Sequence, residues 1–156
     1  MTVSYEGQAV ADAMRDEYEA IVGAGWRMHQ ELVWVKDAFV LGHSDYHYQH
    51  EPIFYGYAPG PGRPGRGDHV GSRWYGDHRQ GSTLAFDRPR RSEAHPTMKP
   101  VALVEACLAN STLPGGGVLD VFSGSGTTII ASERLGRRCY AMEIDPRYVA
   151  VAIDRW

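Results

Sequence analysis

The chain has 156 residues, of which 43% are hydrophobic and 22% charged. This length suits one domain that buries roughly 70% of its unfolded surface, and the composition excludes disorder as the default state. The net charge of −3 at pH 7 means that a nucleic-acid partner would need a local patch of positive charge.

Targeting and redox features place the chain in a reducing compartment. No run of about 18 apolar residues is present, and the N-terminus lacks a basic stretch followed by an apolar one. Cys107 and Cys139 lie in apolar stretches, which favours buried thiols over a disulfide or a metal site. We therefore expect a cytoplasmic protein without a membrane partner.

The first third of the chain predicts a short strand, a helix and an antiparallel ribbon. Residues 2–5 suit a strand, and residues 8–22 carry apolar residues at helical spacing before two glycines. Strands are expected over residues 27–36, with residues 38–42 extending or turning the first, and over residues 50–58. The connection between them is rich in histidine, aspartate and tyrosine.

Residues 59–81 form a region of glycine, proline and arginine, which predicts a long loop, and residues 82–86 suit a brief strand. The acids are concentrated before residue 35, whereas the arginines are concentrated after residue 60. A phosphate-contacting surface requires such local charge, although a merely solubilising loop has the same composition. The arginines of residues 60–92 are Arg63, Arg66, Arg73, Arg79, Arg88, Arg90 and Arg91.

The last third alternates helix and strand. We expect a helix over residues 100–110 with Pro100 in its first turn, a strand over 117–121, and a helix opening at Thr127 or Thr128. A strand over 138–142 and a helix over 146–156 follow. The strand at 117–121 is apolar at successive positions, which is typical of a parallel strand covered on both faces.

A glycine turn joins that strand to its helix. Gly124 and Gly126 allow the backbone to approach a ligand where a Cβ would clash, and the helix directs its first N–H groups towards the same point. Glu143 ends the next strand, 23 positions after Asp120. An acid at that place suits the hydroxyls of a ribose. The alternative is an ordinary strand-to-helix turn that binds nothing.

The turn, Asp-Val-Phe-Ser-Gly-Ser-Gly-Thr-Thr at 120–128, resembles the S-adenosylmethionine loop of DNA amino-methyltransferases. His-Pro-Thr-Met-Lys-Pro at 95–100 looks like the family's segment for the methionine end of the cofactor, and residues 143–148 resemble its ribose-binding strand end. Trp-Val-Lys at 34–36 and the residues at 45–52 resemble the side of the family that receives the target base. This order is that of the permuted β group.

The resemblance implies two sets of site residues. The cofactor would be bound by His95, Thr97, Lys99, Asp120, Phe122, Ser123, Gly124, Ser125, Gly126, Thr127, Thr128, Glu143 and Asp145. The target base and DNA would contact Trp34, Lys36, Asp45, Tyr46, His47, Tyr48, Glu51, Arg63, Arg66, Arg73 and Arg79. Tyr46, His47 and Tyr48 would face an extruded base, while Trp34 and Glu51 would fix the ribbon.

Other interpretations of these residues stay open. The histidines and acids at 43–51 could form a metal cluster, although neither cysteines nor a helical histidine pair is present there. The same stretch could be a polar hairpin tip. Lys99 could be exposed to water, but a cation near the positive end of a helix is disfavoured, so a ligand carboxylate explains it better.

One family motif is absent from the sequence. The family accepts the hydrogens of the target amine with an Asp, Asn or Ser followed by Pro-Pro and an aromatic residue, and no such string occurs here. The motif lies upstream of everything matched, so we expect the N-terminal third of the family's domain to be missing. The isolated chain should then be inactive, and should form a homodimer or bind a complementing N-terminal fragment.

Together these features predict one α/β domain with a truncated, Rossmann-like class I methyltransferase fold: a mostly parallel sheet with an antiparallel edge ribbon. Residues 1–58 would supply the target side, 59–94 a loop, and 95–156 the cofactor side. The implied function is site-specific DNA methylation at adenine N6 or cytosine N4, as in restriction–modification. A catalytically incomplete cofactor- and DNA-binding subunit, or another nucleotide-binding protein of the same fold, are the alternatives.

Overall fold

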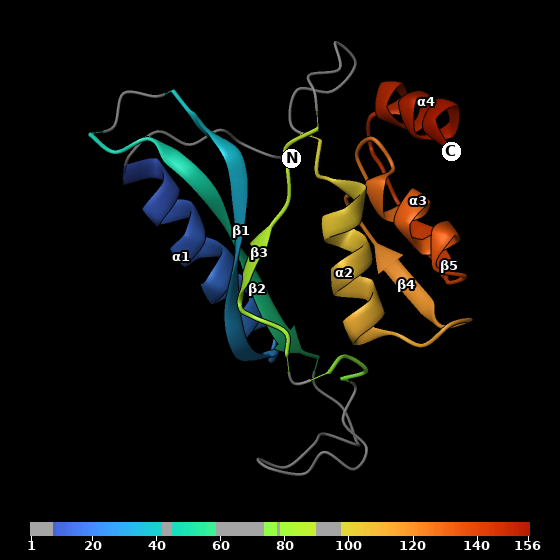
Figure 1. The fold of residues 1–156 in the computed structure, drawn as a ribbon, viewed down its shortest axis with the longest axis horizontal. Coiled ribbons are helices and arrows are strands. Elements are labelled where there is room, and N and C mark those ends of the chain that lie inside the picture. The colour runs from blue at the N-terminus through green and yellow to red at the C-terminus, as the bar shows by residue number, and fades with distance from the viewer. Residues whose placement is uncertain (1–7, 42–44, 59–73, 78, 90–97) are drawn as a thin grey trace. The chain divides into compact units, whose positions relative to one another are not determined.

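The computed structural model describes residues 8–41, 45–58, 74–77, 79–89 and 98–156. The chain divides into two compact units, shown in Figure 1. The ribbon unit comprises Thr2–Ser72 and Gly81–Ala85, and the glycine-loop unit comprises Met1, Arg73–Gln80 and Phe86–Trp156.

The ribbon unit begins with α1 (Gln8–Gly23). The helix ends where Gly25, at a φ of 81°, donates its N–H to the Val22 carbonyl at 2.9 Å, and Trp26 donates to the Ile21 carbonyl at 3.1 Å. This pair of hydrogen bonds is the Schellman motif, which needs a left-handed residue and therefore favours glycine. The expected stop at Gly25 is confirmed.

The sheet of this unit has the strand order β2-β1-β3. Strand β1 (Arg27–Val40) pairs antiparallel with β2 (Tyr48–Tyr57) and parallel with β3 (Thr83–Ala85). The Tyr18 ring of α1 meets the edge of Phe54 on β2, at a centroid distance of 6.3 Å. The predicted ribbon is present, and its first strand is longer than residues 27–36.

A bulge interrupts the ribbon between Val35 and Val40. Val35 pairs with His50 and Val40 with Tyr48, so four residues of β1 oppose Gln49 alone. The Gln49 side-chain amide donates to the Lys36 carbonyl at 3.1 Å and thereby binds a backbone acceptor inside the bulge.

The glycine-loop unit contains α2 (Val101–Ser111), β4 (Gly117–Asp120), α3 (Thr127–Arg134), β5 (Arg138–Ala141) and α4 (Pro146–Arg155). Strands β4 and β5 are parallel and α3 connects them, so the three elements form a βαβ unit. The buried apolar side chains of the unit include Leu103, Val118, Ala131 and Ala152.

The structure corrects two expectations for this region. Val118 is 8% exposed but its neighbour Leu119 is 70% exposed, because within the described residues the helices cover only one face of β4 and β5. Pro100 is the N-cap residue that precedes α2 and not part of its first turn. The described strands are assigned to two small sheets, one in each unit. The strand expected at residues 2–5 lies outside the described residues.

Within the described ranges, no helix is long and apolar enough to cross a membrane. In the same ranges, no group of three or more histidine, cysteine or acidic residues is arranged to hold a metal ion.

Candidate functional site

The turn after β4 is hydrogen-bonded to the end of β5. The Met142 N–H donates to the Asp120 carbonyl at 2.8 Å, and the Ser123 N–H donates to the Met142 carbonyl at 3.0 Å. The Asp120 carboxylate accepts from the Phe122 N–H at 3.0 Å. The carboxyl ends of the two parallel strands are therefore joined, and the Phe122 side chain, 77% exposed, extends from the turn.

Two glycines give the turn its shape. Gly124 has a φ of 51° and Gly126 a φ of 78°, both in the left-handed region that disfavours other residues. Gly126 donates to the Ser123 carbonyl at 2.9 Å and is the N-cap residue of α3, although no side chain caps that helix. A Cβ on Gly126 would lie 2.7 Å from the Cβ of Ala152, so only glycine fits there.

Glu143 connects the turn to the chain that follows β5. One carboxylate oxygen accepts from the Gly124 N–H at 2.7 Å, and the other accepts from the Asp145 N–H at 2.9 Å. The hydrogen bonds from the Asp145 and Gly124 backbones hold the pKa of Glu143 below its ordinary value. A carboxylate has about four acceptor positions, so it retains capacity for a further donor.

Asp145 caps α4. Its carboxylate accepts from the Arg147 N–H at 2.9 Å and forms an ion pair with the Arg147 guanidinium at 2.6 Å. The arginine side chain, followed by its backbone N–H, lowers the pKa of Asp145. Because an N-cap aspartate stabilises the first turn of a helix, the structure gives this residue a structural role. Pro146 occupies the first turn, where its missing N–H costs nothing.

The segment before α2 reaches the same turn. The Thr127 hydroxyl donates to the Lys99 carbonyl at 3.4 Å, and Lys99 is half-buried. Ser125 and Thr127 are buried, at 4% and 7% exposure, and Thr128 is half-buried. Residues 98–100 thus lie against the start of α3, next to the glycine turn.

In the ribbon unit, Trp34, Lys36 and Glu51 contact one another. Trp34 and Glu51 are partners across β1 and β2. The Lys36 ammonium lies 2.8 Å from a Glu51 carboxylate oxygen and 5.4 Å from the centre of the Trp34 ring. Trp34 is 2% exposed and the Lys36 side chain 7%. The charge is therefore buried, paired, and stacked on an aromatic face.

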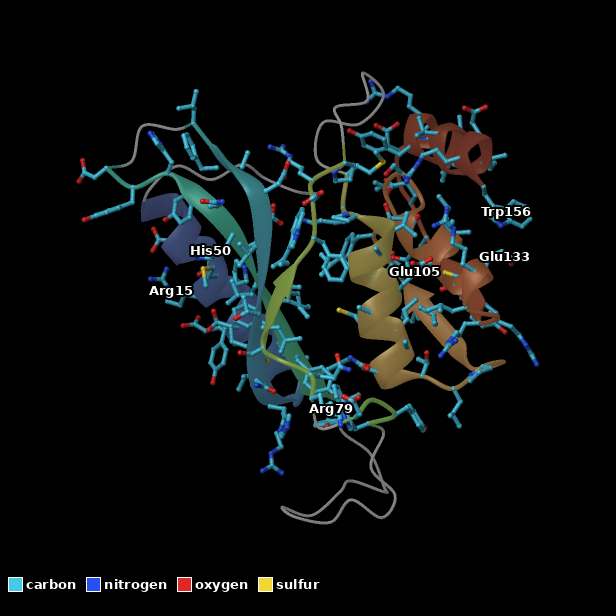
Figure 2. The ribbon with its side chains drawn as sticks, in the orientation of Figure 1. Arg15, His50, Arg79, Glu105, Glu133 and Trp156 are labelled. Atoms are coloured by element: carbon cyan, nitrogen blue, oxygen red, sulfur yellow. The ribbon has the colours of Figure 1, made fainter. Side chains whose placement is uncertain are left out.

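The far end of the ribbon carries exposed rings. Tyr46 is 90% exposed and Phe39 54%, and Phe39 stacks on His47 with ring centres 5.2 Å apart. The Tyr48 ring meets the edge of His50, which Figure 2 labels, at 6.2 Å. Asp45 is exposed as well. Flat rings without cover are suited to stacking on other flat rings.

The predicted site residues therefore fall into two regions, one in each unit. The exposed Arg79 donates its backbone N–H to the Asp77 carboxylate at 2.9 Å (Figure 2). The remaining predicted residues lie outside the described ranges: His95, Thr97, Arg63, Arg66 and Arg73.

Sequence reasoning missed three residues that contact these regions. Ala152 packs against Gly126, Arg155 donates to Ser125, and Phe39 stacks on His47. The sequence offers only a weak signal for Ala152 and Arg155. They lie three positions apart on the helix that follows Glu143, the acid expected to bind a ribose. The third depends on the bulge, which has no local sequence signature.

Comparisons with known proteins identify the fold. The profile of a family described as DNA methylase, of the N6/N4 type, matches residues 2–154. The chain is similar to the crystal structure of the M1.HpyAVI–SAM complex, with a TM-score of 0.72 and 22% identity over 93% of this chain and 70% of that one. It is also similar to the cytosine-N4-specific PvuII DNA methyltransferase, with a TM-score of 0.71 and 18% identity over 92% and 56%. The class I methyltransferase fold is thereby confirmed.

A curated relative gives a stronger but shorter match. The type II methyltransferase M2.DpnII of Streptococcus pneumoniae is 43% identical over 61 residues, which are 39% of this chain and 23% of the relative. The match thus spans less than a quarter of that enzyme, and the structural matches span between about half and 70% of theirs.

Proposed function

This chain belongs to the DNA methylase family, and we propose that it takes part in S-adenosylmethionine-dependent methylation of an exocyclic amine in DNA, at adenine N6 or cytosine N4. The observation that carries the proposal is the Glu143 carboxylate, which is hydrogen-bonded to Gly124 where two parallel strands end. In open α/β sheets, ligands bind beyond the carboxyl ends of the strands.

The residues present in the turn suit this cofactor. Gly124, with its left-handed backbone and no Cβ, leaves room for a ligand along the backbone. Glu143 is held in one orientation and keeps acceptor capacity for ribose hydroxyls. Phe122 offers an exposed ring to an adenine. Lys99, with Thr97 before it, would bind the methionine carboxylate. Bound there, S-adenosylmethionine supplies a methyl group on a sulfonium.

The chain's own contribution to such a reaction would be to bind and orient. A methyl group passes directly from a sulfonium to a nucleophile, so the rate depends on in-line placement. The ribbon unit would hold the extruded base, with Tyr46, His47 and Tyr48 as its contacts. Lys36, Glu51 and Trp34 would keep the two strands in register behind them.

Calorimetry tests the cofactor part of this proposal. S-adenosylmethionine and S-adenosylhomocysteine should both bind the pure chain with one-to-one stoichiometry, because neither the ribose contacts nor the adenine contacts involve the methyl group. ATP at the same concentration should give no comparable heat, since its triphosphate would approach Glu143. Absence of heat with both sulfur compounds would contradict the assignment.

DNA is the proposed substrate, and its binding should depend on the arginines after residue 60. Replacing Arg63, Arg66, Arg73 and Arg79 by alanine should reduce the slope of log K against log salt by about 0.9 for each phosphate that the variant no longer neutralises. A control variant removes the same charge elsewhere, at the exposed Arg15, Arg27, Arg134 and Arg138. Equal slopes for the two variants would leave the region with only a solubilising role.

A second candidate function follows from the absent motif. The sequence has no Asp-, Asn- or Ser-Pro-Pro-aromatic string, so nothing recognised here accepts hydrogens from the target amine. A second copy of the chain would lack the string too, so a homodimer alone would not restore it. We therefore propose that transfer needs a polypeptide segment carrying the motif in addition to residues 1–156.

Radiolabelled methyl transfer distinguishes the two candidates. The pure chain should transfer no more label to mixed-sequence DNA than its Glu143→Ala variant, and a co-expressed polypeptide with the motif should restore transfer. Transfer by the pure chain above that control would show that another of its side chains accepts the amine hydrogens. The cytoplasmic location stays a prediction.

A further inference from the structure

Arg155, at the end of α4, donates hydrogen bonds into the glycine turn. The same guanidinium nitrogen, Nη1, contacts the Ser125 carbonyl oxygen, the Ser125 hydroxyl at 2.8 Å and the Thr127 hydroxyl at 3.5 Å. These three acceptors flank Gly126, the N-cap residue of α3. A residue 30 positions further along the chain therefore touches the turn on both sides of its second glycine.

Helix α4 supports the turn by packing as well. The Cβ of Ala152 lies where a side chain at Gly126 would be, 2.7 Å from an ideal Cβ there. Ala152 is 5% exposed. Ala152 and Arg155 are three positions apart, so they lie on one face of the helix. Through that face, α4 packs against the glycine turn.

The other end of α4 is tied to the same turn through Glu143. Its carboxylate accepts from Asp145, the N-cap residue of α4, and from Gly124. The turn is thus held at Gly124 through the start of the helix and at Ser125 through its end. A segment containing two left-handed glycines has wide conformational freedom of its own, so such restraints determine its shape.

The environment of Arg155 strengthens this restraint. The side chain is half-buried, and burial lowers the pKa of its guanidinium, which nevertheless remains charged at neutral pH. Ser125 is 4% exposed. Hydrogen bonds from a charged donor to shielded acceptors are stronger than those between neutral groups.

We propose that Arg155 is a positioning residue for the candidate cofactor site: with Ala152 it holds the Ser125–Gly126–Thr127 turn in the conformation that binds S-adenosylmethionine. The identity of the ligand in this inference rests on the proposed function. The restraint of the turn by Arg155 does not depend on that function. Arg155 acts through the turn and is not assigned a contact with the cofactor or with DNA.

Arg137 provides a matched control. It is also half-buried and hydrogen-bonded, donating to the Thr112 hydroxyl at 3.1 Å and to the Thr112 carbonyl at 2.8 Å. Those contacts join the residue before β5 to the C-cap residue of α2, and no contact of Arg137 with the glycine turn is found among the described residues. Arg137→Ala should therefore lower the melting temperature much as Arg155→Ala does, without altering the turn.

The experiment uses the full chain with Arg155→Ala, Arg155→Lys and Arg137→Ala. Calorimetry with S-adenosylmethionine, at a temperature where circular dichroism shows every variant folded, should give a Kd raised roughly ten- to a hundredfold for Arg155→Ala. Arg155→Lys should restore part of the affinity, because an ammonium supplies a charged donor but not the planar fork. Arg137→Ala should bind like the wild type.

Amide hydrogen exchange without ligand supplies a second readout. The Gly124 and Gly126 amides should exchange about tenfold faster in Arg155→Ala than in wild type, consistent with loss of a charged hydrogen bond, while the amides of β4 and β5 stay unchanged. If the wild type fails to bind S-adenosylmethionine, the proposed function is wrong. The restraint of the turn by Arg155 is then tested by the amide exchange rates alone. Unchanged exchange at both glycines, or equal loss of affinity in Arg137→Ala, would overturn it.

Discussion

The glycine turn and the ribbon hold their candidate residues in different ways. In the turn, side chains bind backbone: Glu143 accepts from two N–H groups, and Asp120 accepts from the Phe122 N–H. In the ribbon, two candidate side chains bind each other: Lys36 meets Glu51 across two strands, over the ring of Trp34. The turn is restrained through its backbone, whereas these ribbon residues form a buried pair of opposite charges.

This difference separates the effects expected from mutation. Removing a carboxylate in the turn frees backbone donors that water or the rest of the loop can satisfy, so the fold should persist while ligand binding suffers. Removing a carboxylate in the ribbon leaves a buried charge without its partner, so the fold itself should suffer. The following predictions test that contrast.

The largest expected effect is on the stability of the ribbon. Glu51→Ala should lower the free energy of unfolding by about 2–4 kcal/mol, because it leaves the buried Lys36 ammonium uncompensated. We expect a smaller loss of unfolding free energy than for a fully buried ion pair, because the Glu51 side chain is 31% exposed. Urea unfolding measures the change. Glu31→Ala, an exposed glutamate on β1, is the control.

The double variant Lys36→Met/Glu51→Met sharpens this test. With both charges removed, much of the lost stability should return, because apolar side chains of similar length need no compensation in the interior. Loss in the double variant equal to that in Glu51→Ala would mean that packing, and not the charge of Lys36, governs the ribbon.

The second effect concerns the turn. Glu143→Ala should weaken S-adenosylmethionine binding roughly a hundredfold, since two hydrogen bonds to a charged acceptor are lost together. Calorimetry measures the Kd. Glu133→Ala, on the exposed side of α3 (Figure 2), removes the same charge and should leave the Kd unaltered. Equal affinity of wild type and Glu143→Ala would remove the carboxylate from the site.

A smaller effect is expected at the tip of the ribbon. Tyr46→Ala should weaken DNA binding about five- to tenfold, because stacking of one base on an aromatic ring is lost. The melting temperature should stay constant, since the side chain is 90% exposed. Fluorescence anisotropy with a duplex containing one unpaired base measures the affinity. Tyr75→Ala, 45% exposed in the other unit, is the control.

The sequence predicted the turn more completely than the ribbon because the turn's main determinants are local. Gly124 and Gly126 are adjacent to the strand and helix that they join, and Glu143 follows at the end of the next strand. Backbone geometry then places all three together. The elements of this half were accordingly predicted with boundaries close to those observed.

The unpredicted contacts join distant segments or depend on irregular backbone. Arg155 reaches Ser125 only through the packing of α4, and Phe39 reaches His47 only because four residues of β1 oppose one of β2. The exposure of Leu119 was missed for a similar reason. An apolar side chain indicates a face that tends to be covered, but the local pattern does not reveal what covers it.

The smallest expected effect is the pH dependence of the turn. Hydrogen bonds from the Asp145 and Gly124 backbones hold the pKa of Glu143 below its ordinary value of about 4.5. The unfolded chain therefore takes up this proton at a higher pH than the folded chain. The stabilisation is complete above the ordinary pKa and disappears as the pH falls through the lowered one. At pH 7 wild type should melt above Glu143→Gln, and this gap should close as the pH falls below about 4.5. Melting curves of both proteins from pH 7 to pH 3 measure it, and a gap that widened on acidification would mean that the carboxylate is not the acceptor of these two N–H groups.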